Sequence, residues 1–585
     1  MWKRLAGSLR EYKKPTVWTL FLMVGEALIE TLIPFITAMY LINPIQRDGE
    51  NVDMGYIIGI GVLLIAMAFV SLTCGGLGGL TCSRASAGFA KNLRHDIFEK
   101  VQSFSFENVD RFSTSSLVTR MTTDVSHVQM AYMMVIRTAI RSPLMLVFSV
   151  AMSAVMGGWL ATIFVVVIPV LVVGLLLVAK FAMPAFRSVF KKYDRLNESI
   201  EENVRAMRVV KGFSREEYEK EKFGAASDAI RDDFTRAERI VAINTPLMNF
   251  CMYFNMIAVL LLGSFMAING IGGVEIGQIS ALLTYGMQVL MALMMLSFIY
   301  VMLTMSAQSA KRICEVLDEV PAMKNPEHPV MTVADGSVDF EGVSFKYSEH
   351  AERAALEGIN LHIKSGQTVG IIGGTGSSKS TLVQLIPRLY DVSEGCIKVG
   401  GMDVREYDLE TLRDAVAMVL QKNLLFSGTI KENLRWGNPN ATDEEMIEAC
   451  KLSAAHAFIE SFPYGYDTVI EQGGTNVSGG QKQRLCIARA LLKKPKILIL
   501  DDSTSAVDTK TDAMIREGLR SYLPETTKLI IAQRISSVQD ADLILVMDNG
   551  RIADMGTHGK LLETSEIYRE VYSQQTNGGD EHAEV

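Results

Sequence analysis

The sequence predicts an all-α membrane domain of six helices followed by an α/β domain. Apolar residues are concentrated in the first half of the 585-residue chain, and the mean hydropathy of +0.21 is high for a soluble protein. After Val338, strand-like and helix-like patterns alternate, which is typical of an α/β domain. The stretch Gly370–Thr381 reads GIIGGTGSSKST and lies between a short strand pattern and a helical run. This order of strand, tight loop and helix is what a phosphate-binding loop needs.

Six apolar runs approach the ~20 residues that a helix needs to cross a bilayer. They are Val17–Ile42, Tyr56–Cys82, Ile140–Val155, Leu160–Phe181, Pro246–Ile268 and Ile279–Met305. The third run is short for a span, and we expect its helix to begin nearer Met130. A basic stretch from Lys3 to Lys14 precedes the first run, and no cleavable signal peptide is evident.

The charges of the connecting segments orient these spans. Lysine and arginine are abundant in Arg84–Arg141 and Lys180–Arg239. They are nearly absent from the short links Asn43–Gly55, Met156–Trp159 and Asn269–Gly277. By the positive-inside rule, the long segments and both termini lie in the cytoplasm and the short links lie outside. The sequence therefore predicts a multi-pass protein of the cell membrane.

The two long cytoplasmic segments have helical patterns rather than loop patterns. Ala87–Gln102 and Arg187–Val210 carry charged faces and are expected to extend the membrane helices into the cytoplasm. The chain must then turn back, and the candidate turns are Asn108–Thr119 and Lys211–Tyr218. A short helix across each turn would be well placed to contact a cytoplasmic domain.

Three polar residues of the predicted spans are candidates for a functional role. Glu26 and Glu30 are four residues apart in the first span and so share one helical face. A carboxylate inside a bilayer is costly and faces the bundle interior or a water-filled cavity. One interpretation is a site for cationic substrates, with Gln288 of the sixth span as a further cavity residue. The other is structural, with the carboxylates bonded to neighbouring helices or lying near the external surface.

Composition limits the function classes, and the sequence pattern indicates the domain bounds. The formal net charge is −8 and the pI is about 5.7, so no basic excess suggests nucleic-acid binding. The seven cysteines are scattered without a C-x-x-C pair, which indicates reduced thiols. We expect a membrane domain over 1–320, a proline-containing linker over 321–337, a soluble domain over 338–575 and a polar tail over 576–585.

The residues of the phosphate loop can be assigned one by one. Successive backbone N–H groups would surround the β-phosphate, and Lys379 would reach the β- and γ-phosphates. The Ser380 hydroxyl would ligate Mg²⁺. Ser378 stands where glycine usually precedes the lysine, because the backbone there is tight. The predicted nucleotide-binding residues of the loop are Gly373, Gly374, Thr375, Gly376, Ser377, Ser378, Lys379, Ser380 and Thr381.

Four positions outside this loop have a chemical interpretation. Tyr347 lies upstream of the loop and could stack on adenine. Asp501 follows a buried strand pattern and can hold the water shell of Mg²⁺. Asp502 occupies the next position, where a general base would orient the attacking water. Gln421 could sense the γ-phosphate or ligate Mg²⁺.

A second helix start carries the sequence VSGGQ at Val477–Gln481. Ser478, Gly479 and Gly480 would form another anion-binding helix N-terminus. One ATP does not need two such sites from one domain. We therefore expect this segment to bind a nucleotide that is held by another subunit.

With these motifs in this order, the chain resembles a half-transporter of the ATP-binding cassette (ABC) superfamily with the exporter fold. The family's motifs are a phosphate loop at Gly373–Thr381, a Gln loop at Gln421, a signature at Val477–Gln481, a Walker B strand at Ile497–Asp501 and a dimer-contacting loop at Ser505–Asp508. The resemblance implies that the two cytoplasmic turns act as coupling helices. It also implies that ATP is sandwiched between one domain's phosphate loop and the other domain's Ser478, Gly479, Gly480 and Gln481. Mg²⁺ would lie at Ser380, Gln421 and Asp501.

Three departures from the family pattern surround one nucleotide. The family has glutamate where this chain has Asp502, which is one C–C bond of ~1.5 Å shorter. A misplaced general base forfeits a factor of ~10²–10⁴ in rate. Gln533 replaces the switch histidine and can donate a hydrogen bond, but it cannot carry a proton. Together with Ser378, these residues resemble the degenerate subunit of heterodimeric bacterial multidrug and lipid exporters.

The resulting hypothesis is ATP-driven export of amphipathic compounds, namely drugs, lipids or peptides, by a pair of half-transporters in a bacterial cell membrane. The partner would carry the Walker B glutamate and the switch histidine, and the other interactions would be with membrane lipids rather than nucleic acid. One alternative is a homodimer with slow hydrolysis at both sites. Another is an ATP-gated regulatory or channel-like membrane protein, and an importer with the same fold is a further possibility.

Overall fold

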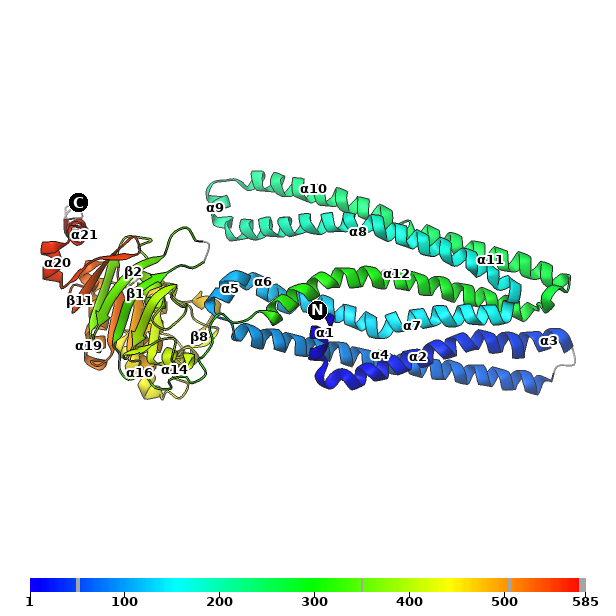
Figure 1. Cartoon of the computed structure of the whole chain (residues 1–585), viewed down its shortest axis with the longest axis horizontal. Coiled ribbons are helices and arrows are strands. Elements are labelled where there is room, and N and C mark those ends of the chain that lie inside the picture. The colour runs from blue at the N-terminus through cyan, green and yellow to red at the C-terminus, as the bar shows by residue number, and fades with distance from the viewer. Residues whose placement is uncertain (49–52, 349–350, 503–506, 578–585) are drawn as a thin grey trace. The chain divides into compact units, whose positions relative to one another are not determined.

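The computed structural model describes residues 1–48, 53–348, 351–502 and 507–577. They form two compact units. The first consists of Met1–Gln102 with Ser113–Glu319, and the second consists of Ser103–Phe112 with Val320–Val585. Among the described residues, the first unit is helical throughout, and all named strands belong to the second (Figure 1).

Long helices make up the first unit. By length and composition, five helical stretches of the described residues could cross a membrane. One of them, Thr114–Phe186, contains both the third and the fourth predicted spans. The two spans are separated at Gly158, where φ is 49° and the chain reverses. The elements of this unit are α1 (Trp2–Leu5), η1 (Ala6–Tyr12), α2 (Lys13–Ile36), η2 (Thr37–Ile42), α3 (Asn43–Asp48), α4 (Met54–Gln102), α6 (Thr114–Thr119), η4 (Arg120–Asp124), α7 (Val125–Gly157), η5 (Gly158–Ala161), α8 (Thr162–Arg205), α9 (Met207–Gly212), α10 (Glu216–Val241), α11 (Asn244–Ile268), η6 (Ile271–Gly273) and α12 (Ile276–Asp318).

The third predicted span is the second half of a much longer helix. α7 begins at Val125, before the expected start near Met130, so its charged first half was not recognised as part of a membrane helix. The second cytoplasmic turn also begins earlier than predicted, because α8 ends at Arg205 and α9 follows at once. α10 then starts at Glu216, where three glutamates in its first turn complement the helix dipole.

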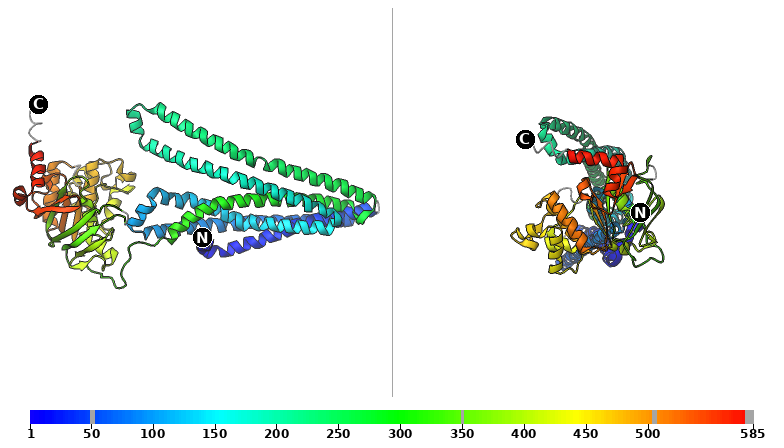
Figure 2. Two further views of the ribbon diagram at one scale, coloured as in Figure 1. Left: turned by 45° about the horizontal axis from the view of Figure 1, so that its top comes forward. Right: turned by 90° about the vertical axis from the view of Figure 1, so that its left-hand side faces the viewer.

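The long helices of this unit form two sets. α7 packs along α12, and α8 packs along α10. Toward α9, the ribbons of α8 and α10 diverge from those of α7 and α12 (Figures 1 and 2). Apolar side chains of the membrane helices face outward, as Leu72 and Leu80 of α4 do, which suits contact with lipid.

The described residues of the second unit form two main sheets and a small antiparallel pair, β7 with β8. The larger has the strand order β12-β11-β3-β10-β9-β6 and is parallel except for β12. The smaller is antiparallel, with the order β2-β1-β4-β5. The strands are β1 (Val338–Phe345), β2 (Leu356–Ile363), β3 (Thr368–Gly373), β4 (Glu394–Val399), β5 (Met402–Asp403), β6 (Val416–Val419), β7 (Gly428–Thr429), β8 (Val469–Ile470), β9 (Ile497–Asp501), β10 (Thr527–Ile531), β11 (Leu543–Asp548) and β12 (Arg551–Gly556).

Helices complete the second unit. They are α5 (Phe106–Phe112), α13 (Lys379–Gln384), α14 (Leu409–Ala415), α15 (Ile430–Arg435), α16 (Asp443–Leu452), α17 (His456–Glu460), η7 (Gly465–Asp467), η8 (Gln472–Gly474), α18 (Gly479–Leu492), α19 (Thr509–Tyr522), η9 (Ile535–Ser537), α20 (His558–Thr564) and α21 (Glu566–Asn577). Every residue of β9 and of β10 is buried. Because Ile531 pairs with both Ile371 of β3 and Asp501 of β9, the carboxyl ends of three parallel strands meet at one edge. Ligands of open α/β sheets bind at that edge.

Candidate functional site

The phosphate loop joins β3 to α13 through backbone conformations that glycine adopts most easily. Gly373 has a φ of 153°, and a Cβ there would lie 2.2 Å from the carbonyl oxygen of Met547. Gly376 has a φ of 82° and Ser378 a φ of 67°. The left-handed conformation costs a residue with a Cβ about 1–2 kcal/mol. This cost explains why glycine is usual at the position of Ser378 and why serine is still accommodated.

The side chain of Lys379 folds back over this loop. Its Nζ donates to the carbonyl oxygens of Gly373 at 2.9 Å and Gly374 at 2.8 Å, and to Ser377 Oγ at 3.3 Å. Burial lowers the pKa of Lys379, although the charges of Asp501 and Asp502 oppose that shift. A phosphate beside Nζ would favour the charged ammonium. The loop therefore fits a polyanionic ligand.

Ser380 and Asp501 lie together at the edge of the larger sheet. Ser380 Oγ donates to Asp501 Oδ1 at 2.9 Å. Burial raises the pKa of Asp501, whereas the hydrogen bond from Ser380 and the charge of Lys379 lower it. A hydroxyl and a carboxylate are oxygen ligands of the kind that Mg²⁺ takes beside substrate phosphates. These two residues thus fit the predicted magnesium site.

Asp502, Gln533 and Gln421 meet at one carboxylate oxygen. Gln533 Nε2 donates to Asp502 Oδ2 at 2.8 Å, and Gln421 Nε2 lies 3.5 Å from the same oxygen. Burial raises the pKa of Asp502, and the two amide groups lower it. The carboxylate at the general-base position is therefore held by two side-chain amides. Gln421, expected also as a magnesium ligand, contacts Asp502 through its amide nitrogen.

Tyr347 lies beside the helix that follows the phosphate loop. Its hydroxyl forms a hydrogen bond of 2.9 Å with Thr381 Oγ1, and half of its surface is exposed. Its ring meets the ring of Tyr390 edge-on, with centroids 5.3 Å apart. An exposed aromatic ring in this place is suited to stacking on the base of a bound nucleotide.

The VSGGQ segment starts α18 with a reciprocal cap. Gln481 N donates to Ser478 Oγ at 3.3 Å, and Ser478 N donates to Gln481 Oε1 at 2.8 Å. Gly479 and Gly480 are the first two residues of the helix, so their backbone N–H groups have no partner within the helix. The segment is thus the capped start of α18, a helix of 14 residues. Of the predicted dimer-contacting loop, Ser505 lies outside the described residues, and Asp508 caps α19 by accepting from Thr511 N at 3.0 Å.

Comparison with known proteins identifies the family. A model described as "ABC transporter transmembrane region" matches residues 17–293, and a model described as "ABC transporter" matches residues 356–505. The chain belongs to the ABC transporter family. It is 36% identical over 567 residues to the ABC transporter ATP-binding protein YfiB of Bacillus subtilis, with 97% of each chain covered. A fatty acid ABC transporter ATP-binding/permease protein of Mycobacterium bovis is 33% identical over 476 residues, with 81% of this chain and 75% of that protein covered.

A solved structure, that of a bacterial Atm1-family ABC exporter with ATP bound, resembles this ABC exporter over nearly its whole length. The TM-score is 0.83 at 25% identity, with 96% of this chain and 98% of the other covered. The predicted fold class is therefore confirmed: an exporter-fold membrane domain is followed by an ABC nucleotide-binding domain. The soluble domain binds ATP, and its ATPase activity is coupled to transport.

The polar residues of the membrane domain are paired across helices. The guanidinium of Arg141 on α7 lies 3.4 Å from Glu26 and 2.5 Å from Glu30 on α2. Gln288 on α12 accepts from Ser149 Oγ at 2.8 Å. It also donates to the carbonyl oxygen of Glu30 at 3.3 Å. Three helices are therefore joined through these side chains.

Sequence reasoning did not find Arg141 as this partner. The charge pattern of the sequence places it at the end of a cytoplasmic segment, whereas it lies in the middle of α7, 16 residues before Gly157. The available signal was the spacing of Arg137 and Arg141, which are four residues apart like Glu26 and Glu30 and so share one helical face.

The ion pairs favour the structural interpretation of the two glutamates, and the cationic-substrate interpretation stays a prediction. Glu26→Gln distinguishes them, because the amide keeps the side-chain shape but removes the charge. Under the structural interpretation, export of cationic and neutral substrates falls equally. Selective loss of cation export, measured in vesicles with the same variant, would instead assign Glu26 to a substrate site. Arg141→Gln is the stronger perturbation, because it leaves both carboxylates without their cationic partner. We expect it to lower the free energy of unfolding by about 3–5 kcal/mol.

Lys379→Ala is expected to weaken ATP binding at this chain's own site by about 10- to 100-fold, since a hydrogen bond to a charged group contributes ~1.5–3 kcal/mol. Photo-crosslinking of labelled nucleotide to this chain measures the loss. Lys364→Ala, which removes an exposed lysine of the same domain, is the matched control and should label normally. Undiminished labelling of Lys379→Ala would mean that the loop does not hold the phosphates.

Proposed function

We propose that this chain is one subunit of a heterodimeric exporter of amphipathic compounds and that its own ATP site turns over slowly. The observation that carries the proposal is the group formed by Asp502, Gln533 and Gln421. A carboxylate one C–C bond too short, by ~1.5 Å, cannot reach the water that a glutamate would orient. Its contact with Gln533 replaces the contact that a switch histidine would make. Slow hydrolysis by ~10²–10⁴ follows from the loss of the general base.

Nucleotide binding at this site needs neither Asp502 nor Gln533. Lys379 and the loop N–H groups supply the electrostatic contacts to the phosphates, and Tyr347 supplies the surface for adenine. When bound, Mg²⁺ neutralises charge on the β- and γ-phosphates, and the residues that would hold it are Ser380, Asp501 and Gln421. This chain's site is thus suited to retain ATP rather than to turn it over.

The partner in this proposal is a second half-transporter with a Walker B glutamate and a switch histidine. Ser478, Gly479, Gly480 and Gln481 keep the geometry of an anion-binding helix start, so they would complete the partner's site. The turn between α8 and α10, which contains α9, also suits docking on another subunit, because apolar residues in and beside it are exposed. Phe213 is 75% exposed and Val204 is 63% exposed. Exposed apolar clusters of this kind mark interaction sites.

The proposed location is a bacterial cell membrane, with both termini and the ATPase domain in the cytoplasm. The lysine and arginine bias of the long helical segments supports this orientation. A lipid-like substrate is favoured among drugs, lipids and peptides, because one relative that aligns with 81% of this chain is described as a fatty acid transporter.

Coupling between ATP and the membrane helices is proposed to pass through α5. Asp110 of α5 accepts a hydrogen bond of 2.9 Å from the hydroxyl of Tyr390, whose ring also lies 6.1 Å from Phe106. Tyr390 in turn contacts Tyr347, the proposed adenine residue. Asn108 of α5 accepts from Ala322 N at 3.1 Å. Binding or release of the adenine base at Tyr347 can therefore affect α5 through the rings of Tyr347 and Tyr390.

Tyr390→Ala is expected to uncouple the two activities, because it removes the ring that lies between Tyr347 and α5. Substrate-stimulated ATPase activity in liposomes should fall severalfold, while nucleotide labelling of the chain is retained. Tyr390→Phe keeps the ring and loses only the bond to Asp110, so it should retain more stimulation than the alanine variant. Normal stimulation in Tyr390→Ala would exclude this route of coupling.

Purification of the chain with its genomic neighbour tests the proposed function directly. A complex of two different half-transporters, with substrate-stimulated ATPase activity in liposomes, is the expected result. A homodimer by mass analysis would support the slow homodimer instead. A complex that binds ATP but shows no substrate stimulation and no transport would favour an ATP-gated regulatory protein.

A further inference from the structure

An apolar cavity of about 620 Å³ lies within the first unit, between the N-terminal segment and three long helices. Trp2, Leu5 and Leu9 line it from the N-terminal segment, and Phe89, Val135 and Tyr300 line it from α4, α7 and α12. Its volume is within the range of about 300–1,000 Å³ that holds drug-sized ligands. None of its lining residues belongs to the ATP site or to the polar cluster around Arg141.

The walls of this cavity offer little to a polar ligand. Two of its hydroxyl groups are already bonded. Tyr132 forms a hydrogen bond of 2.7 Å with Thr16 Oγ1, and Thr304 donates to the carbonyl oxygen of Tyr300 at 2.8 Å. The remaining contacts come mainly from aliphatic and aromatic side chains. The group that fills the cavity is therefore apolar.

The cavity lies at the depth of the cytoplasmic membrane surface in the proposed orientation. Its lining residues on α7, Val128 to Val135, precede the outer end of that helix at Gly157. At ~1.5 Å per residue this separation is about 33–44 Å. A bilayer with its headgroups is about 40–45 Å thick. Trp2, half exposed beside the cavity, is a residue type that favours this interface.

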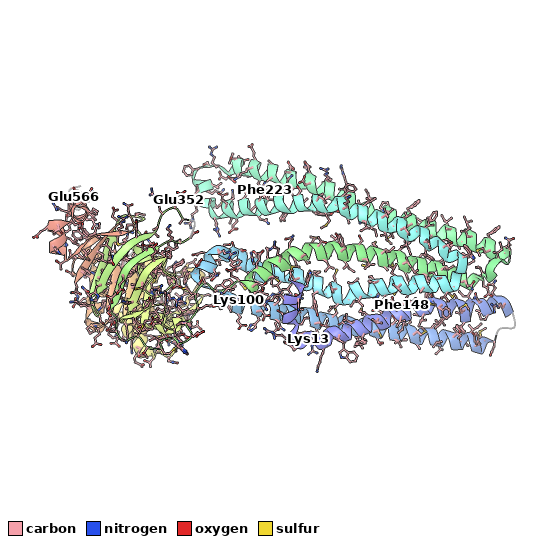
Figure 3. The ribbon with its side chains drawn as sticks, in the orientation of Figure 1. Lys13, Lys100, Phe148, Phe223, Glu352 and Glu566 are labelled. Atoms are coloured by element: carbon pink, nitrogen blue, oxygen red, sulfur yellow. The ribbon has the colours of Figure 1, made fainter. Side chains whose placement is uncertain are left out.

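Basic residues flank the cavity on the same segment. Arg4 and Arg10 are paired, at 3.1 Å with Asp318 and at 2.5 Å with Asp96. Lys3, Lys13 and Lys14 are exposed, and within the described parts of the chain no ion pair is formed by any of the three. Lys13 lies at the surface of the helical unit where α2 begins (Figure 3). Each of these lysines attracts an anionic headgroup by about 1 kcal/mol near a membrane surface.

We propose that this cavity binds an acyl chain of an anionic phospholipid from the cytoplasmic leaflet, with the lipid phosphate held among Lys3, Lys13 and Lys14. The proposal rests on the proposed orientation, which places the N-terminal segment at the cytoplasmic surface. An apolar cavity and an unpaired cationic rim match the two ends of such a lipid. The bound chain would fill the space between the N-terminal segment, α7 and α12, and so fix that segment against the bundle.

Quenching of Trp2 fluorescence by brominated lipids tests this site. Trp18, Trp159 and Trp436 are replaced by phenylalanine in the full chain, which is placed in nanodiscs of phosphatidylcholine. A minor fraction of either brominated phosphatidylglycerol or brominated phosphatidylcholine is then added. Trp2 should be quenched at least twofold more by the anionic lipid.

Two further variants separate the chain contact from the headgroup contact. Lys3→Gln, Lys13→Gln and Lys14→Gln together should make the two lipids quench equally. Ala307→Phe fills part of the cavity and should reduce quenching by the anionic lipid. A chain that keeps only Trp18, which is 63% exposed on α2, reports ordinary lipid contact and should show no preference.

Equal quenching of Trp2 by the two lipids, or unchanged quenching in a folded Ala307→Phe chain, would overturn the proposal. The lysine variant does not alter the cavity, so it stays informative if Ala307→Phe fails to fold. The readout requires neither ATP hydrolysis nor a partner subunit. Failure of this lipid site is therefore distinguishable from failure of the proposed export function.

Discussion

Replacing Asp502 by glutamate and Gln533 by histidine in the same chain is expected to raise hydrolysis at this chain's own site by about 10²–10⁴-fold. Glutamate extends the carboxylate by one C–C bond, ~1.5 Å, toward the attacking water. Histidine restores a group that can carry a proton. The two positions must change together, because Gln533 Nε2 donates to Asp502 Oδ2 at 2.8 Å and holds that carboxylate in place.

The measurement isolates one of two sites. In the purified pair, the phosphate-loop lysine of the partner is replaced by alanine, so that only this chain's site hydrolyses ATP. Gln533→His alone is the matched control and should give little gain, since the carboxylate of Asp502 stays too short. An unchanged rate in the double variant would show that these two residues do not limit hydrolysis.

That the residues predicted for the ATP site lie together could be expected from the sequence, because they follow short local patterns. A buried strand run that ends in Asp501 and a glycine-rich loop that ends in Ser380 both lie at the carboxyl edge of one parallel sheet. Because both segments end at this edge, Ser380 and Asp501 lie close together, with a hydrogen bond of 2.9 Å between them. The conformation of Ser378 was also foreseeable, since glycine at that position signals a left-handed backbone.

The membrane domain could be predicted only in outline. Hydropathy finds spans, but it assigns charged residues to loops, and Arg141 therefore marked the end of a segment rather than the centre of α7. Its pairing with Glu26 and Glu30 depends on how α2 and α7 pack, which no local pattern specifies. The cavity beside Trp2 is likewise formed by four segments that are far apart in the sequence.

Gly480→Asp is expected to abolish most ATPase activity of the pair, by a factor of about 10²–10³ or more. The loss of one preorganised donor to a transition state costs about 3–4 kcal/mol, and an aspartate here also adds a negative charge that faces phosphate. The fold should survive, because Gly480 lies in the first turn of α18, where a carboxylate stabilises a helix by about 0.3–1 kcal/mol. The thermal unfolding of the purified variant is therefore measured together with its ATPase rate, to show that the chain is folded.

Asp502→Ala provides the contrast that makes this prediction decisive. In the proposed heterodimer the carboxylate of Asp502 does not act as the base, so its removal should leave most of the steady-state activity, which would arise at the partner's site. Gly480→Ala adds a methyl group without charge and separates the steric part of the aspartate effect from the electrostatic part. If Asp502→Ala proves as damaging as Gly480→Asp, this chain's own site is catalytic and the degenerate-subunit proposal is wrong. If Gly480→Asp leaves the rate intact, Ser478–Gln481 does not contact the nucleotide that is hydrolysed.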